Sequence, residues 1–475
     1  MSIKKYIASK DTTITDAFRE SLNSRAKEAN IGGADSLEVF SILGQATTSS
    51  IEKSRILVEF PINNILSDRN LNIIPASGSV NFFLRMFNVE HPFTVPKNFT
   101  LNLAPISGAW VEGRGLDLDS YSDYGFSEDF NGEGSNWLFS KSDVYWLNEG
   151  GDYYTGSYIL SQSFVSGLED VEIDVTNICE QWISNNIENN GFIVFLSGSA
   201  ENGLANESFY TKRFSARSSE YFFKRPCIEA RWNPSVLDDR NNFFASSSML
   251  SSEDNLMNLY FYNKVNGKLK NIVGNPIPNV LFYSDSAYTN QISSSFIGVT
   301  NPSAGIYRAS VAINSTSSFL YDKWVNPSNV NVKYFSGSFE VFQRENDYSP
   351  KTPEYVVNIT NLKPHYLQNE QIKFNIYIRE RDWQPNIYTI AYNNIENTII
   401  PNLYYKIFRF NDNYTVIDYS TGSLAYTKTS YDSSGNFFDF DMNILEKDYG
   451  YGIKLALWDG NSLQEFKDVF KFRVN

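Results

Sequence analysis

Residues 171–199 read VEIDVTNICEQWISNNIENNGFIVFLSGS, and the hydrophobic pattern changes twice within this stretch. From 171 to 175 apolar and acidic residues alternate, which predicts a strand with one buried face. Thr176 can cap a short helix after that strand, because the apolar residues that follow fall on one helical side. After the break at Asn-Asn-Gly, the continuous apolar run 192–196 predicts a buried strand.

One more strand closes this region. It runs from Cys227 to Trp232, starts after Pro226 and ends before Asn233-Pro234. Together these elements predict a folded scaffold, and their pattern is not that of an active site.

The composition sets the broad class of protein. The chain has 475 residues, of which 42% are hydrophobic, so it is not disordered and should form about three domains. It carries 8 Trp, 30 Tyr and 36 Phe, which favours strands, because Tyr and Phe fit pleated, half-buried surfaces. The formal net charge of -14 disfavours nucleic acid and anionic membranes as partners.

Targeting signals are not evident in the sequence. No segment approaches the roughly 20 apolar residues of a membrane helix, and the start MSIKKYIASK is not a secretory signal. We therefore expect a protein made in the cytoplasm without a signal peptide, and no membrane partner.

The first half also contains further strands and a helix. Apolar residues at helical spacing between Thr15 and Glu28 predict an amphipathic helix, either packed on its own domain or serving as a docking arm for another subunit. The remaining strands are predicted at residues 2–9, 37–44, 54–60, 79–89 and 99–106.

A long loop from Gly113 to Tyr158 interrupts the strands, and loops of this length are typically functional. Its aromatic residues could contact other subunits, pack internally or stack on sugar rings. Trp110 and Trp182, in contrast, are expected in the core. The candidate binding residues of the loop are Tyr121, Tyr124, Trp137, Trp146, Tyr153 and Tyr154.

Six short motifs resemble those of the DNRLRE family. They are LVEFPI (57–62), WVEG (110–113), IDVTNICEQW (173–182), NNGF (189–192), FYTKRF (209–214) and RPCIEARW (225–232). The resemblance covers roughly residues 3–232 and implies a jelly-roll β-sandwich, similar to carbohydrate-binding modules. The long loop and the N-terminal helix depart from the family pattern, and both suit a module that contacts other subunits.

The first half is also similar to virion structural proteins of tailed bacteriophages, particularly the marine T4-like group. This resemblance implies a particle protein whose partners are other virion proteins and copies of itself. The resemblance does not say where on the particle the protein lies, and head decoration, the neck or collar, and the tail all remain open.

The second half is predicted to hold two smaller domains. Residues 233–255 are polar and Ser-rich, which indicates a linker or an ordered strap. Residues 256–349, with an Asn-Gly hairpin turn at 266–267, predict a β-sandwich, and residues 350–475 predict a C-terminal immunoglobulin-like sandwich. The expected fold class is therefore all-β: an N-terminal jelly roll with a short helix, followed by two immunoglobulin-like antiparallel sandwiches.

Residues that could support catalysis or bind a cofactor are few. The two histidines, His91 and His365, are far apart, and the common catalytic and nucleotide-binding motifs are absent, so we expect no enzyme and no cofactor.

Cys179 and Cys227 are expected as small buried residues, with a disulfide or metal pair as the alternative. Asp117, Asp119 and Asp123 form a weak calcium candidate, against the simpler interpretation of an acidic, solvated loop.

Three functions remain open at this point. The leading hypothesis is a non-enzymatic structural component of a virion that acts through protein–protein interfaces. The alternative is a carbohydrate-binding or host-adhesion module whose partner is a surface glycan. A hydrolase would require two carboxylates facing each other across a cleft.

Overall fold

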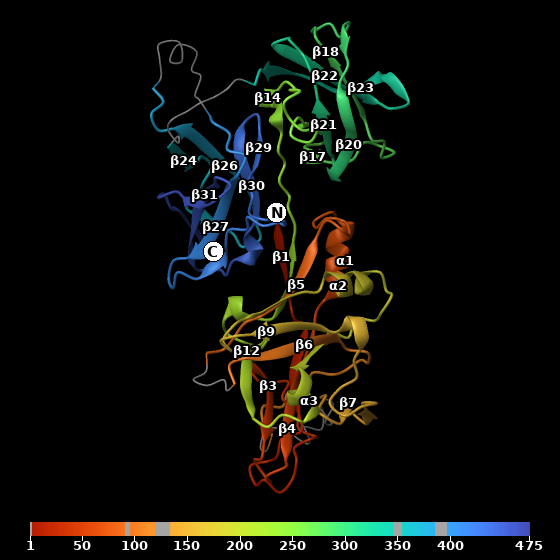
Figure 1. Cartoon of the computed structure of the whole chain (residues 1–475), viewed down its shortest axis with the longest axis vertical. Helices are drawn as coiled ribbons and strands as arrows, with labels where there is room; N and C mark the ends of the chain where they lie inside the picture. Colours follow the sequence, from red (N-terminus) through yellow and green to blue (C-terminus); the bar gives the residue numbers. More distant parts are fainter. Residues whose placement is uncertain (1, 91–95, 119–133, 345–353, 385–396) are drawn as a thin grey trace. The chain divides into compact units, whose positions relative to one another are not determined.

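The computed structural model describes residues 2–90, 96–118, 134–344, 354–384 and 397–475. It divides into two compact units, one of residues Ile3–Trp232 and one of Asn233–Asn475 with the first two residues. Both units are built from antiparallel strands with few helices, which confirms the all-β class (Figure 1). The jelly-roll and immunoglobulin-like strand orders remain predictions. Among the described residues, no helix is long and apolar enough to cross a membrane.

The unit Ile3–Trp232 contains two large sheets. The four-stranded sheet has the order β1 (Ile3–Ile7), β13 (Cys227–Arg231), β5 (Asn81–Met86) and β10 (Val171–Asp174). The seven-stranded sheet has the order β12 (Phe209–Ser215), β3 (Ser36–Leu43), β4 (Ile51–Glu59), β11 (Phe192–Leu196), β6 (Phe99–Pro105) and β9 (Leu160–Phe164), and β2 (Lys10–Thr15) pairs with β4.

The stretch that opened the sequence forms the predicted elements. β10 is followed by helix α2 (Thr176–Ile183), which buries Ile178, Cys179 and Trp182, and then by β11. The predicted cap is wrong in detail, because the Thr176 hydroxyl does not cap α2 but accepts a hydrogen bond from the Phe82 N–H at 2.9 Å. The carboxylate of Asp174 instead accepts from the Thr176 N–H at 2.9 Å.

A helix absent from the sequence prediction lies next to α2. Helix α1 (Ile62–Asn70) follows Pro61, buries only Ile62 and Ile65, and lies beside α2 in Figure 1. The Arg69 guanidinium donates to both carboxylate oxygens of Glu180 in α2, at 2.7 and 2.6 Å. A third short helix, α3 (Gly198–Asn202), follows β11.

The helix predicted between Thr15 and Glu28 is wrong. Thr15 is the last residue of β2, and the chain then folds back on itself through a bridge between Phe18 and Arg25. Leu22 has a φ of 55°, a left-handed conformation that an α-helix does not contain. The helical spacing of the apolar residues here is therefore coincidental, and the segment after Thr15 forms turns around the bridge between Phe18 and Arg25.

Both cysteines are free and buried, as predicted: Cys179 lies in α2 and Cys227 in β13. Burial, the dominant effect, raises the pKa of the Cys227 thiol to about 12, so this thiol is protonated at neutral pH.

In the second unit, the first sandwich region combines a five-stranded and a three-stranded sheet. Its core surrounds the fully buried Trp324, Phe261 and Tyr307. The five-stranded order is β14 (Phe243–Phe244), β23 (Asn329–Phe342), β22 (Phe319–Asn326), β18 (Asn279–Tyr283) and β19 (Gln291–Ile292). The three-stranded order is β15 (Met257–Tyr262), β21 (Ile306–Ala312) and β20 (Ser295–Ser303), and β16 (Lys264–Val265) with β17 (Lys268–Leu269) forms the expected hairpin.

The polar segment after Trp232 is an ordered strap in its first part. Leu237 forms a parallel bridge with Tyr431, and β14 pairs in parallel with the end of β23. The strap thus contributes backbone hydrogen bonds to the folded unit.

The C-terminal region also contains two sheets. One has the order β24 (Tyr355–Ile359), β26 (Gln371–Glu380), β30 (Gly435–Asp441) and β29 (Ser430–Asp432). The other has the order β25 (His365–Tyr366), β33 (Phe470–Val474), β31 (Gly450–Trp458), β27 (Leu403–Arg409) and β28 (Thr415–Ile417), with β32 (Leu463–Glu465) paired to β31.

Candidate functional site

Strand β11 lies in the middle of the seven-stranded sheet and is buried along its whole length. Side chains of a strand alternate between the two faces of the sheet, so Ile193 and Phe195 point to the face opposite Phe192 and Val194. Ile193 and Phe195 belong to a hydrophobic cluster with Leu57 of β4. Both faces of this sheet are therefore covered, which explains the continuous apolar run in the sequence.

The long loop provides that cover. Trp137 and Trp146 belong to the same buried cluster as Ile193, and the Tyr153 ring lies 4.9 Å from the Phe195 ring. Residues 134–159, called the cover segment from here on, thus form a layer over the outer face of the sheet. Its tryptophans are core residues of this layer, with only 3% and 6% of their surface exposed.

Backbone hydrogen bonds fix the cover segment at several points. The Trp137 N–H donates to the Lys27 carbonyl at 3.1 Å, and the Gly150 N–H donates to the Trp137 carbonyl at 2.7 Å. The Trp146 indole N–H donates to the Asn136 carbonyl at 2.9 Å. Gly150 has a φ of +86° and lies so close to the Trp137 ring that a Cβ would approach it to 2.8 Å, so only glycine fits here.

A cation lies between the cover segment and the sheet. The Arg55 guanidinium sits 5.1 Å from the Trp137 ring centroid and donates to the Gly150 carbonyl at 2.6 Å. It also donates to the Glu201 carboxylate from two nitrogens, at 3.0 and 2.6 Å. Because the ion pair and the ring contact share one arginine, the charge is compensated where it is largely removed from water.

The cover segment also exposes an apolar tip. Strands β7 (Phe139–Lys141) and β8 (Val144–Tyr145) form a small hairpin just before Trp146. Tyr145 is 68% exposed and Leu147 is 91% exposed, and the Phe139 ring lies 4.4 Å from the Tyr145 ring. Val144, Tyr145 and Leu147, called the hairpin tip, therefore present apolar side chains to solvent on a base held by two buried tryptophans.

The six aromatic candidates of the loop differ in their exposure to solvent. Trp137 and Trp146 are buried, so they anchor the loop and are not accessible to a sugar or a partner. Tyr153 and Tyr154 are partly buried. Tyr121 and Tyr124 lie outside the described residues. Trp110 and Trp182 are buried, as predicted.

The sequence prediction missed Tyr145 and Leu147, although the sequence contains a signal for them. Both flank Trp146, and neighbours in an extended segment point to opposite sides. A buried Trp146 therefore implies that the side chains before and after it point outwards.

For the calcium candidate, Asp119 and Asp123 lie outside the described residues, and Asp117 is partly buried. Within the described ranges, no group of three or more His, Cys, Asp or Glu residues could hold a metal ion.

Glu112, from the WVEG motif, connects three segments. Its carboxylate accepts from the Asp11 N–H at 2.8 Å and from the Arg217 guanidinium at 2.6 Å. The Asp11 carboxylate accepts a hydrogen bond from the backbone N–H of Arg217 at 2.5 Å. Burial, opposed in part by Arg217 and reinforced by Glu112, raises the pKa of Asp11 to about 7. This motif therefore acts as a structural clamp.

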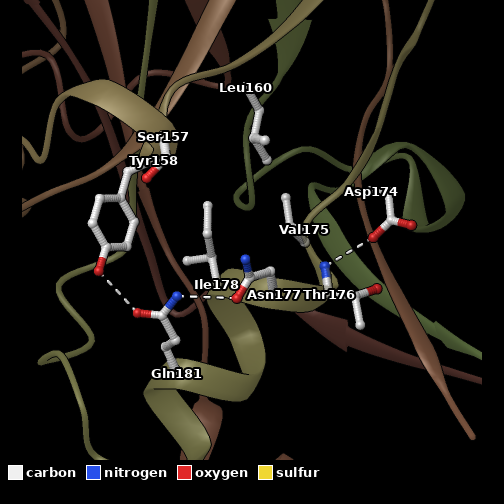
Figure 2. A pocket seen from close by; sticks show the side chains of 9 residues that line it. All are labelled: Ser157, Tyr158, Leu160, Asp174, Val175, Thr176, Asn177, Ile178 and Gln181. Carbon is white, nitrogen blue, oxygen red and sulfur yellow. Dashed lines mark hydrogen bonds between the residues drawn. The ribbon is translucent and has the colours of Figure 1, made fainter. Parts of the chain in front are cut away.

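A pocket of about 500 Å³ lies at the other end of the cover segment. Figure 2 shows its nine lining side chains, which come from the turn Gly156–Tyr158, the start of β9, the end of β10 and the first turns of α2. They are Ser157, Tyr158, Leu160, Asp174, Val175, Thr176, Asn177, Ile178 and Gln181. The floor contains apolar side chains, and hydroxyl, amide and carboxylate groups lie around it.

Hydrogen bonds order the polar side of this pocket. The Tyr158 hydroxyl donates to Gln181 Oε1 at 3.0 Å, and Gln181 Nε2 donates to Asn177 Oδ1 at 3.0 Å (Figure 2). The Asn177 amide group is therefore oriented, with its nitrogen on the side away from Gln181. The centroids of the Tyr154 and Tyr158 rings lie 5.3 Å apart, so the two rings are in contact.

Comparisons with known proteins complete the description. No family model matches this chain, and no curated protein matches it. A chimeric titin Z1Z2-Z1Z2 tandem functionalised with a GRGDS peptide from fibronectin is 12% identical, with 50% of this chain and 95% of that one covered and a TM-score of 0.15. The Yersinia pseudotuberculosis adhesin InvE is 10% identical, with 50% and 56% covered and a TM-score of 0.15.

Proposed function

We propose that this protein is a non-enzymatic structural component of a tailed-phage particle and acts through protein–protein contacts. The hairpin tip carries the proposal. Exposed aromatic and aliphatic side chains on a rigid base are typical anchors of protein interfaces. The assignment to a phage particle is supported by the resemblance of the first half to virion structural proteins.

The rigidity of the hairpin base strengthens this interpretation. Trp137 and Trp146 are buried, and Arg55, paired with Glu201, packs against the Trp137 ring. A partner that binds Tyr145 and Leu147 would meet a surface that is already ordered, so little conformational entropy is lost on binding. On this proposal a partner covers the 91% exposed leucine and the 68% exposed tyrosine.

The first test is the presence of the protein in purified particles, measured by quantitative mass spectrometry. We expect a copy number that matches a symmetry of the particle. Its absence from particles would contradict the proposal.

The second test addresses the hairpin tip itself. Leu147→Asp places a charge in the proposed interface and should reduce incorporation into particles at least tenfold, while the melting temperature stays within about 1 °C because Leu147 makes few contacts. Leu204→Asp is the matched control, since Leu204 is an exposed leucine of the same unit, at 76%. Equal incorporation of both variants would rule out the hairpin tip as the interface.

A further inference from the structure

We propose that the pocket beside α2 binds a neutral sugar residue. The pocket is separate from the hairpin tip: the two share no residue, although both involve the cover segment or its end. Its volume of about 500 Å³ lies within the range of roughly 300–1,000 Å³ typical of small-molecule sites.

The charge of the lining favours a neutral ligand. None of the nine lining residues is basic, and the only ionisable acid among them is Asp174. A carboxylate in a lining that contains no basic residue disfavours phosphate, sulfate and carboxylate ligands. The Asp174 carboxylate accepts from the Thr176 N–H at 2.9 Å and, on its other oxygen, from Asn81 Nδ2 at 3.5 Å; since each carboxylate oxygen can accept more than one hydrogen bond, it can still accept from a ligand hydroxyl group.

The apolar part of the lining favours a ring with one hydrophobic face. Val175 and Ile178 are buried beneath the pocket, and Leu160 and the Tyr158 ring are partly exposed at its side. A pyranose has C–H groups on its faces and hydroxyl groups around its edge. Its face can therefore contact these apolar groups while its edge meets the polar groups of the rim.

The hydrogen-bond chain supplies the specificity. Since the Tyr158 hydroxyl donates to Gln181 and Gln181 donates to Asn177, the Asn177 nitrogen is left as a donor (Figure 2). Together with the Ser157 hydroxyl and the Asp174 carboxylate, it offers both donors and acceptors to vicinal hydroxyl groups. The oriented Asn177 amide and the Asp174 carboxylate thus lie beside the apolar side chains of Val175 and Ile178 (Figure 2).

The test uses the full chain on a printed array of neutral and anionic glycans, followed by calorimetry with the best neutral glycan in solution. We expect binding of at least one neutral glycan. Asn177→Ala should weaken that binding about tenfold, because a direct hydrogen bond is lost. Gln181→Leu should weaken it as well, because the Asn177 amide is then free to rotate.

Asn186→Ala is the matched control, since Asn186 is an exposed asparagine just after α2 that does not line the pocket. It should bind like the unmodified protein, and so should Leu147→Asp, so that this proposal and the hairpin interface fail or succeed independently. The proposal is overturned if no neutral glycan binds, if anionic glycans bind as tightly as neutral ones, or if both Asn177→Ala and Gln181→Leu retain full affinity.

Discussion

Two strands of the unit Ile3–Trp232, β11 and β13, are buried along their whole length, yet different chemistry covers their outer faces. The outer face of β11 is covered by the aromatic layer of the cover segment. On β13, Cys227, Glu229 and Arg231 alternate with the apolar Ile228 and Ala230, and the charged face is covered by ion pairs.

The ion pairs on β13 form a connected ladder. Glu229 pairs with Lys5 of β1 at 3.1 Å and with Arg231 at 2.5 Å, and Arg231 pairs with Glu172 of β10 at 2.5 Å. Burial alone would raise the pKa of Glu229, but Lys5, Arg231 and Arg85 hold it at about 2. The aromatic layer over β11 stabilises the fold as long as its side chains fit together. The ion pairs over β13 stabilise it only while every partner remains charged.

The largest loss of unfolding free energy is expected when the aromatic layer over β11 is truncated. Trp137→Ala should lower the free energy of unfolding by about 3–5 kcal/mol, because a buried indole is lost and a cavity remains. Chemical denaturation of the full chain measures this. Tyr145→Ala, one residue before Trp146 but 68% exposed, should change it by less than about 0.5 kcal/mol. A similar loss for both variants would show that the cover segment is not a core layer.

A slightly smaller loss of unfolding free energy is expected when the ion pairs on β13 are broken, and this loss depends on pH. Because the pKa of Glu229 is about 2 in the folded protein and 4.5 in the reference state, its stabilisation is present above pH 4.5 and is lost as the pH falls towards 2. At neutral pH, Glu229→Gln should cost about 3 kcal/mol.

The pH profile of unfolding distinguishes this cause from general packing. Glu229→Gln should lose much of the acid dependence between pH 4.5 and 2, whereas the exposed Glu188→Gln should keep it. If both variants follow the profile of the unmodified protein, Glu229 does not stabilise the fold through its charge.

The smallest loss of stability is expected when Glu229 and its two direct partners, Lys5 and Arg231, are replaced together, which leaves the Arg85–Glu172 pair in place. The triple change Lys5→Met, Glu229→Leu and Arg231→Met converts the β13 face to the kind of cover that β11 has. Replacing buried ion pairs by apolar residues of similar size is often neutral, so we expect stability within about 1–2 kcal/mol of the original at pH 7. A loss as large as that of Glu229→Gln alone would show that the charges contribute specific stabilisation.

Local patterns in the sequence were sufficient for much of the fold. β10, α2, β11 and β13 were predicted because each has a strong period or an apolar run bounded by Asn, Gly or Pro. Helix α1 was missed because its sequence, INNILSDRN, buries only two residues and shows little periodicity. The false helix at 15–28 arose because Phe18, Leu22 and Ala26 have helical spacing by coincidence, and the turn at Leu22 leaves no local signal.

The candidate sites were less predictable, since they depend on contacts between distant residues. The length of the loop directed attention to residues 113–158, but the burial of Trp137 depends on Lys27 and Arg55, more than 80 residues away. The pocket arises because Tyr158 at the end of the loop meets Gln181 in α2. In the sequence, Gln181 appeared only as a residue on the polar side of a helix.

The cover segment has a consequence for the folding kinetics. It closes over β11 through contacts such as that of the Asn30 amide with the Ser135 carbonyl, 105 residues apart in sequence. The sheet is held by continuous ladders on both sides of β11, whereas the cover segment docks through separate side-chain and backbone contacts, so we expect an intermediate in which the sheet has formed and Phe192–Leu196 is still uncovered on one face. FIVFL is apolar, uncharged and free of proline, which is the composition of a self-associating β-segment. The yield of refolding should therefore fall steeply as the protein concentration rises, because the exposed FIVFL strands of different chains can associate before the cover segment docks.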